Sequence, residues 1–307
     1  MTRIIFSVIA LASLFVQVCN AQSGHTNWKG WSFDFNVSGA RNSGLEITNV
    51  RYNGQLVLYR GSMPVIRVQY FGANPCGPYQ DRISPSNVIN ATCSGTGKLG
   101  NICQYQFTWG GSGQWLEIGA YATIGAYHLY QAWYFSEDGR IHSRMWSKGL
   151  HCQQDHEHHP YWRLDFDING ASDDQVFVHG NARPNSGWGP GWLKIRNEAT
   201  MTKISGYNEM WFCRDQSTGS GAWLLPGQHD GHAGYWCNED FNARLYKGSE
   251  DVQWMFGPSG SLGYNEHESV EEKDVVLWYI AHLFHHAHEG EDQWHWVGPT
   301  IVCHHQR

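Results

Sequence analysis

The sequence predicts an all-β protein, folded as one large antiparallel β-sandwich, and three observations support this prediction. The 307-residue chain is rich in residues that favour strands and turns, with 16 Trp, 15 Tyr, 13 Phe and 35 Gly. Apolar and polar residues alternate in several segments, as they do in strands that have one buried face. No segment has a clear amphipathic helix period, and no internal repeat is visible in the sequence.

The beginning of the chain is typical of a secretory signal peptide. Residues 1–21 combine a positive charge at Arg3, a short apolar run and a small-residue cleavage site. The run is too short to span a membrane, and the sequence has no other long apolar stretch. We therefore expect residues 22–307 to form a single soluble domain that is secreted. Asn36 and Asn90 begin Asn-x-Ser/Thr sequons, which are compatible with a glycoprotein.

Charge and cysteine content narrow the choice of partners and of compartment. The formal net charge of −7 and the lack of a basic cluster argue against a nucleic-acid partner. In an oxidising compartment most cysteines should pair, and removal of residues 1–21 leaves an odd number of them. Cys93 with Cys103 and Cys213 with Cys237 are the locally plausible pairs.

Strand and turn signals follow one another along the first half of the chain. Trp31–Phe35 and Gly44–Tyr52 are predicted strands, and Asn53-Gly54 predicts a tight hairpin turn into Leu56–Tyr59. A segment rich in Gly, Pro, Ser and Cys, residues 72–104, predicts a long loop held by a disulfide. Further strands are predicted at 104–109, 114–124, 126–135 and 140–146.

The histidines gather in two segments that are far apart in the sequence. Eleven of the 18 histidines lie within His151–His159 and His282–His305. The second segment overlaps a continuous apolar and histidine-containing run, Asp274–His288, which predicts one buried strand. Two distant histidine clusters are what a shared metal site requires.

One predicted strand, which follows the first histidine cluster, carries different chemistry on its two faces. Arg163, Asp165 and Asp167 alternate with Leu164, Phe166 and Ile168. The same parity places His156 and His158 on the apolar side, unless Pro160 introduces a bulge, and the carboxylates on a wet outer side. Two adjacent inward imidazoles are difficult to bury without a metal, which for such ligands is copper, or zinc in a structural site.

These segments together resemble the copper-containing amine oxidases that carry a tyrosine-derived quinone, and specifically the large C-terminal catalytic β-sandwich of that family. The match rests on several motifs in the same order as in the family. They are Trp31 to Gly72, His156-Glu157-His158 with Arg163 to Ile168, Glu272 to Tyr279, and Phe284-His285-His286 through Glu291-Asp292.

The resemblance implies a copper site and a second site of calcium type. Copper would be held by His156, His158 and a third histidine. Counting from the acidic pair that follows gives His286, and counting from the strand that precedes gives His285. The residues that match the family's calcium-type site are Asp165, the carbonyl of Phe166, Asp167, Asp274 and the carbonyl of Val275. Without a cation, these carboxylates would be an ordinary solvated strand face.

The resemblance also implies a catalytic role for two residues. Tyr127 matches the tyrosine that becomes topaquinone, and Asp81 matches the catalytic base. The expected reaction is oxidation of a primary amine by O2 to an aldehyde, with release of hydrogen peroxide and ammonia. The tyrosine's flanks differ from the family's pattern, because Ala126 and His128 replace Asn and Asp or Glu. An ordinary strand tyrosine and a turn aspartate are the alternatives for these two positions.

Three functions therefore compete. The first is a secreted copper amine oxidase, for which the resemblance also allows a homodimer. The second is a non-catalytic copper-binding or structural protein that kept the metal sites and lost the quinone. The third is a Trp-rich module that binds glycans through exposed aromatic residues.

Overall fold

The computed structural model describes most of the chain. The described residues are 22–37, 43–90, 93, 97–180, 191–203, 209–234, 237–248 and 267–304. The predicted signal peptide, residues 1–21, lies outside them. Within these ranges no helix is long and apolar enough to cross a bilayer.

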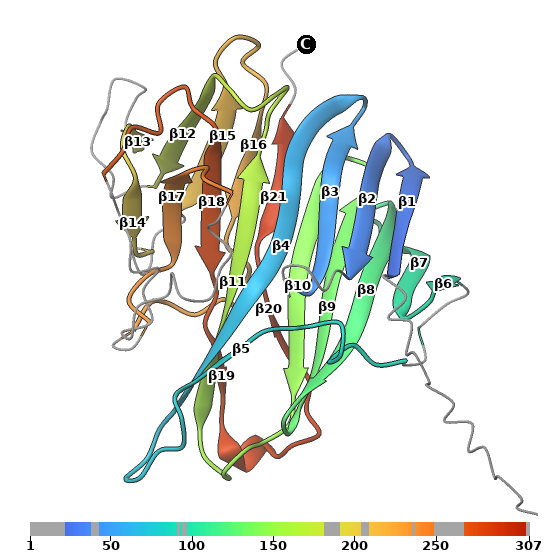
Figure 1. Ribbon diagram of the computed structural model, residues 1–307, viewed down its shortest axis with the longest axis vertical. Coiled ribbons are helices and arrows are strands. Elements are labelled where there is room, and N and C mark those ends of the chain that lie inside the picture. The colour runs from blue at the N-terminus through green and yellow to red at the C-terminus, as the bar shows by residue number, and fades with distance from the viewer. Residues whose placement is uncertain are drawn as a thin grey trace, which may run out of the picture.

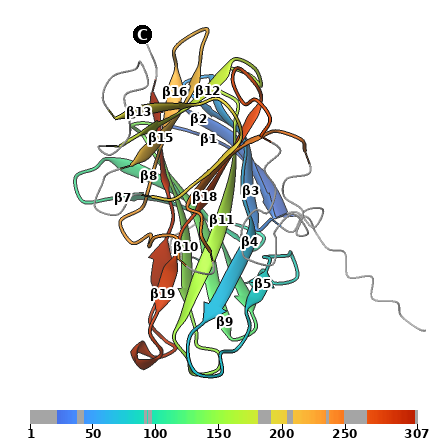
Figure 2. The same cartoon turned by 90° about the vertical axis from the view of Figure 1, so that its left-hand side faces the viewer.

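Two large antiparallel sheets pack face to face, which confirms the predicted all-β sandwich (Figures 1 and 2). Sheet A contains β1 (Gln22–Trp28), β2 (Trp31–Val37), β3 (Leu45–Tyr52), β4 (Gln55–Tyr70), β5 (Tyr79–Asp81), β11 (His156–Phe166), β14 (Ala199–Met201), β17 (Phe241–Leu245), β18 (Val275–Ile280) and β19 (Leu283–His285). Sheet B contains β6 (Gly97–Leu99), β7 (Ile102–Thr108), β8 (Gln114–Ile124), β9 (Tyr127–Ser136), β10 (Arg140–Lys148), β12 (Asp174–His179), β13 (Trp192–Ile195), β15 (Met210–Asp215), β16 (Gly221–Leu225), β20 (His295–Val297) and β21 (Thr300–His304).

The strand order brings sequence-distant segments together at the centre of each sheet. Sheet A runs β1-β2-β3-β4-β11-β18-β17-β14, so β11 lies between β4 and β18. Sheet B runs β13-β12-β15-β16-β21-β10-β9-β8-β7-β6. The inward side chains of both sheets form one apolar core that includes Trp133, Trp162 and Trp211. Burial of this aromatic surface is the main favourable contribution to folding.

The central strand β11 keeps the predicted alternation but not the predicted wet face. Trp162, Leu164 and Phe166 belong to the core between the sheets. The register with β18 is regular, and the irregularity in the pairing with β4 lies between Tyr161 and Arg163. On the outer side, however, Arg163 and Asp165 are almost completely buried. A second apolar cluster, formed with residues of β4, β18 and the segment after β16, covers this face.

The prediction of one continuous buried strand near the C-terminal end of the sequence needs correction. The Asp274–His288 run is not one strand, because pairing stops after β18, resumes in β19 and is followed by a short 3-10 helix, η2 (Ala287–Glu289). The residue pair between β18 and β19, Ala281-His282, leaves the ladder. The apolar period alone could not reveal this break, since β18 is continuously buried and two of the three residues of β19 are buried as well.

The cysteine pairing was predicted only in part. Cys93 and Cys103 form a disulfide as expected. Cys213 and Cys237 do not pair, because they are buried in different apolar clusters. Both sulfur atoms are free thiols. The second disulfide instead joins Cys76 to Cys152, which are 76 residues apart in the sequence.

A buried amide joins the two sheets near the site end of the sandwich. Gln131 on β9 accepts a hydrogen bond from the Leu45 amide (2.8 Å) and donates one to the Leu45 carbonyl (3.0 Å). Trp133 donates a third hydrogen bond to the same carbonyl (3.0 Å). A Cβ at Gly44, whose φ is +69°, would lie 2.1 Å from the Gln131 Oε1, so only glycine fits beside this amide.

Replacing this amide by an apolar group should therefore be costly. We expect Gln131→Leu to lower the free energy of unfolding by about 2–3 kcal/mol, because the Leu45 amide N–H is left buried and unpaired. Chemical denaturation measures the change. The matched control is Gln106→Leu on the exposed side of β7, which should change stability by less than about 0.5 kcal/mol. Equal effects of the two substitutions would contradict this interpretation.

Candidate metal centre

The candidate site lies at the end of the sandwich where β4 ends and β11 begins, near the bottom of Figure 1. The register pairs His156 of β11 with Tyr70 of β4 on one side and with His285 of β19 on the other. Because residues directly opposite in antiparallel strands share a face, these three side chains form one row on the core side. Tyr127, the first residue of β9, approaches this row from sheet B.

His156 and His158 point inward side by side, with ring centroids 5.0 Å apart. The His156 Nδ1 lies 3.1 Å from the Gln154 carbonyl, so it carries the proton and leaves Nε2 with a lone pair. That Nε2 and both nitrogens of His158 are buried without a hydrogen-bond partner among the described residues. Burial lowers the pKa of His156 to about 4 and that of His158 well below its usual value. Both rings are therefore neutral at pH 7 and able to bind a metal.

The geometry separates the two candidates for the third ligand. His285 is buried, and its ring centroid lies 4.9 Å from that of His156. Its Nε2 lies 3.0 Å from the Gly290 carbonyl, which leaves Nδ1 with the lone pair. His286 is half exposed and faces Asp155, 3.5 Å away, on the other side of the chain. The structure thus brings His285 to the site and does not bring His286.

A further histidine, His295 of β20, belongs to the same region. Its ring centroid is 4.4 Å from that of His285, and the two rings form a potential ligand group with Glu289. The sequence places His295 in the second histidine cluster without assigning it a role. Pairing of β20 with β10 places it beside the predicted ligands.

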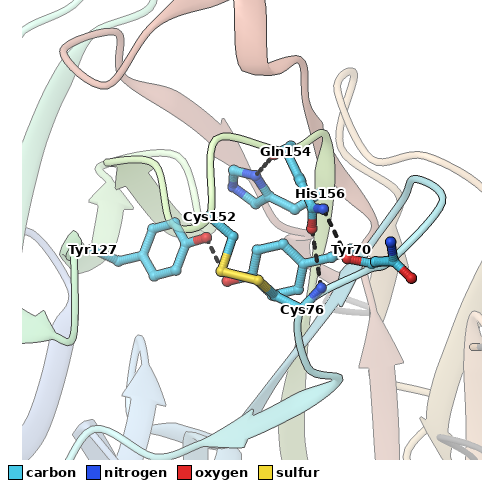
Figure 3. Close-up of a disulfide and its surroundings, with 7 residues drawn as sticks. Tyr70, Cys76, Tyr127, Cys152, Gln154 and His156 are labelled. Carbon is cyan, nitrogen blue, oxygen red and sulfur yellow. Dashed lines mark hydrogen bonds between the residues drawn. A yellow bond between two sulfur atoms is a disulfide. The ribbon is translucent and has the colours of Figure 1, made fainter.

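Tyr127 lies directly against the two inward histidines. Its ring centroid is 4.7 Å from that of His158 and 5.3 Å from that of His156. Its hydroxyl shares a 2.7 Å hydrogen bond with the Tyr70 hydroxyl, and the two groups face each other in Figure 3. Burial raises the pKa of Tyr127, while the hydrogen bond from Tyr70 opposes the shift. No sequence motif indicated Tyr70, whose position depends on the register of β4 with β11.

The Cys76–Cys152 disulfide lies beside Tyr70 and forms one wall of the site (Figure 3). Gln154 supports the same wall, because its side chain accepts a hydrogen bond from the Cys76 amide and donates one to the Asn74 carbonyl, both 3.0 Å long. The disulfide therefore ties the segment after β4 to the segment before β11, one on each side of the histidine row.

Asp81 enters the site from β5, at the edge of β4. The register pairs Asp81 with Ile66, whose side chain belongs to the core, so the carboxylate points toward sheet B. Burial raises the pKa of Asp81. Burial raises the pKa of both Tyr127 and Tyr70, and the negative charge of Asp81 adds a smaller contribution in the same direction.

The predicted acidic residues also converge, on the outer side of the sandwich's other end. One carboxylate oxygen each from Asp165, Asp167 and Asp274 lie within 4.8 Å of one another. Phe166 pairs directly with Val275, so the two backbone carbonyls that the resemblance implies belong to neighbouring strands. Burial, followed by the charge of Asp165, raises the pKa of Asp167 to about 6.

A fourth carboxylate, Asp174, was missed by the sequence interpretation. It begins β12, and both of its oxygens are buried without a hydrogen-bond partner among the described residues. Burial and then the charge of Asp167 raise the pKa of Asp174 to about 10. Such a concentration of buried acid is costly unless a cation binds there or protons are taken up.

The donor sets suit two different kinds of metal. Three neighbouring neutral imidazoles, with unpartnered nitrogens on His156 and His158, are ligands that suit copper. A cluster of carboxylates suits a hard cation such as Ca²⁺. His156 and His158 of the first set and Asp165 of the second lie on opposite faces of β11.

An aromatic groove lies on the outer face of sheet B, away from both sets. Its volume is about 380 Å³. The lining residues are Tyr105, Phe107, Thr108, Trp109, Glu117, Tyr134, His142, Arg144, Trp146 and Trp296. The register explains this grouping, since Tyr105, Glu117, Tyr134 and His142 form one row across β7 to β10.

Neither a protein-family model nor a curated protein sequence matches the chain. Solved structures do match its fold. The Aspergillus nidulans amine oxidase aligns with a TM-score of 0.68 and 16% identity, over 91% of this chain and 51% of that one. The Pichia pastoris lysyl oxidase aligns with a TM-score of 0.69 and 13% identity, with the same coverage.

A copper-containing benzylamine oxidase from Hansenula polymorpha aligns over 97% of this chain and 63% of that one, with a TM-score of 0.69 and 14% identity. At these identities the likeness establishes the fold. The chain is a large antiparallel β-sandwich of the copper amine oxidase type, and it spans between about half and two thirds of the length of these structures.

Proposed function

We propose that this protein is a secreted, copper-dependent oxidase that converts primary amines and O2 to aldehydes, hydrogen peroxide and ammonia. The observation that carries the proposal is the contact between a buried tyrosine, Tyr127, and two neutral imidazoles, His156 and His158, whose nitrogens are unpartnered. His156, His158 and His285 would hold the copper. Bound copper supplies the redox chemistry by which O2 oxidises a neighbouring tyrosine to topaquinone.

The remaining roles follow from the protein's own side chains. Tyr70 holds the Tyr127 hydroxyl by a 2.7 Å hydrogen bond, which fixes the direction of the ring. Asp81 would remove the α-proton of the substrate amine, because burial raises its pKa and so makes it a stronger base than an exposed aspartate. The disulfide wall of Cys76 and Cys152 would exclude water from one side of the pocket.

We further propose that the acidic cluster binds calcium. Asp165, Asp167 and Asp274 supply carboxylates within 4.8 Å of one another, and Asp174 adds a fourth carboxyl group nearby, which a bound cation would help to ionise. The carbonyls of Phe166 and Val275 would complete the oxygen ligands. A cation there would neutralise the buried repulsion and tie β11, β12 and β18 together.

The aromatic groove favours a second candidate function, binding of glycans. Apolar faces of sugar rings pack on aromatic side chains, and Glu117 and His142 would meet the ring hydroxyls. Trp109 at the rim is half exposed. This function needs no metal, so it is compatible with either an active oxidase or a non-catalytic copper-binding protein.

The oxidase proposal predicts a change of mass at one tyrosine. Protein incubated with Cu²⁺ and O2 should gain two oxygen atoms and lose two hydrogen atoms at Tyr127, and it should react with phenylhydrazine. Intact mass and peptide mapping measure the change. Tyr127→Phe should abolish it, and the matched control Tyr121→Phe, on β8, should not. Copper-loaded protein with an unmodified Tyr127 would leave the non-catalytic copper-binding function.

The calcium proposal predicts a different effect for each of two substitutions in the acidic cluster. At neutral pH in the presence of a chelator, Asp174→Asn should raise the free energy of unfolding by about 1–2 kcal/mol, because the raised pKa of Asp174 means that this buried carboxyl group must take up a proton on folding. Asp167→Asn should abolish the gain from Ca²⁺, which for the parent protein is about 2.7 kcal/mol at 100 times Kd. Thermal unfolding measures both, with the exposed Asp173→Asn as control. A parent protein indifferent to Ca²⁺ would contradict the site.

The glycan candidate predicts retention on a polysaccharide column that survives removal of metal. Trp109→Ala should weaken this retention at least tenfold, because it removes the exposed aromatic surface at the rim of the groove. The matched control is Tyr59→Ala, an exposed aromatic residue of sheet A. Retention that depends on copper, or that both variants reduce equally, would argue against the groove.

A further inference from the structure

A second histidine cluster lies on the outer side of β11, away from Tyr127. His159 follows the inward His158 and so points to the opposite face. His282 lies between β18 and β19, and Cys237 lies in the segment between β16 and β17. A ring nitrogen of each histidine and the Cys237 Sγ lie within 4.8 Å of one another, and all three side chains are almost completely buried.

The two imidazoles are in direct contact through one nitrogen of each ring. Their Nδ1 atoms face each other at 2.8 Å. On the opposite side of each ring stands a carboxylate. The His282 Nε2 is 3.0 Å from the Asp240 Oδ1, and the His159 Nε2 is 3.9 Å from the Glu157 Oε2.

The positions of these carboxylates influence which nitrogen of each ring carries the proton. The Asp240 carboxylate lies close enough to favour a proton on the His282 Nε2, which leaves the His282 Nδ1 with a lone pair directed at His159. A proton on the His159 Nδ1 then makes the hydrogen bond between the two rings. Replacing that proton by a metal ion would let both Nδ1 atoms act as ligands. A carboxylate behind each ring is also the arrangement that orients metal-bound histidines and raises their basicity. Asp240 is fixed in this role, since its oxygens accept hydrogen bonds from the amides of Lys203 (2.7 Å) and Ala233 (3.1 Å).

The Cys237 sulfur and the charged groups around it are also compatible with a bound metal ion. Cys237 forms no disulfide, and its Sγ lies 3.1 Å from the Tyr161 hydroxyl, which can donate a hydrogen bond to a thiolate. The charge of Asp240 is offset by the Lys203 ammonium, 3.4 Å away. A divalent ion would then be balanced by one thiolate and by Glu157, so the buried site would be electrically neutral.

We propose that His159, His282 and Cys237 form a transition-metal site of the two-histidine, one-cysteine type, which takes zinc or, with the same donors, copper. Metal–nitrogen distances of about 2.0–2.1 Å and a metal–sulfur distance of about 2.3 Å need only a small opening of the Nδ1 contact. The ion would fasten the segment after β16 onto the outer face of sheet A, where an amide hydrogen bond from Gly231 to the His282 carbonyl (3.0 Å) already holds it.

The site is separate from the copper centre proposed above and does not depend on it. His158 and His159 are consecutive, but they point to opposite faces of β11, so one ion cannot bind both. A metal at the second site would be present whether or not Tyr127 is modified.

Cobalt(II) is a suitable probe, because thiolate coordination gives an intense near-ultraviolet charge-transfer band that a histidine-only site lacks. The full chain, freed of metal by a chelator, should develop this band on addition of one equivalent of Co²⁺ at this site. Cys237→Ser should abolish the band and His156→Ala should retain it. Displacement by Zn²⁺ or by Cu²⁺ then identifies the preferred ion. No band, or a band that survives in Cys237→Ser, overturns the proposal.

A measurement on the unmodified sequence guards against misfolding of the variant. In mild denaturant, Zn²⁺ should reduce alkylation of Cys237 at least tenfold relative to Cys213, which is equally buried but is not part of a ligand group among the described residues. Mass spectrometry of the labelled peptides gives the ratio. An unchanged ratio means that Cys237 does not bind the metal.

Discussion

The strict alternation of side chains along β11 is the constraint on which the rest of the structure depends. His156 and His158 face the core beside Tyr127, and His159 and Asp165 face the opposite side. One residue of slippage would exchange these sets and would place charged groups between the sheets. Pairing with β4 on one side and with β18 and β19 on the other fixes the register.

This arrangement concentrates polar groups in places where water does not reach. Arg163, Asp165, His159 and His282 are all buried on the outer face of sheet A, and the two inward histidines are buried between the sheets. A buried polar group needs a partner, and for clustered imidazoles, thiols and carboxylates the partner with the greatest effect is a metal ion. Metal binding would therefore contribute to stability as well as to chemistry.

Local patterns in the sequence predicted much of the fold. Period-2 alternation and turn residues were sufficient for the strands of the first half and for the inward direction of His156 and His158. The resemblance to copper amine oxidases indicated the sandwich that the solved structures share. The meeting of Asp165, Asp167 and Asp274 also followed from matching motifs.

What the sequence did not predict depends on contacts between distant segments. The choice of His285 over His286 depends on where β19 pairs with β11, and the burial of the outer face depends on the segment that carries Cys237. Tyr70, Asp174 and His295 acquire their positions from strand order. Cys76 and Cys152 are 76 residues apart, so spacing could not suggest their disulfide.

The most direct test of whether both faces of β11 bind metal is anomalous X-ray diffraction. Data would be collected from crystals of metal-loaded protein on both sides of the copper and zinc absorption edges. Two transition-metal peaks are expected, one among His156, His158 and His285 and one among His159, His282 and Cys237. Peaks confined to exposed histidines such as His286 and His288, with none on either face of β11, would contradict the metal-binding role of this strand.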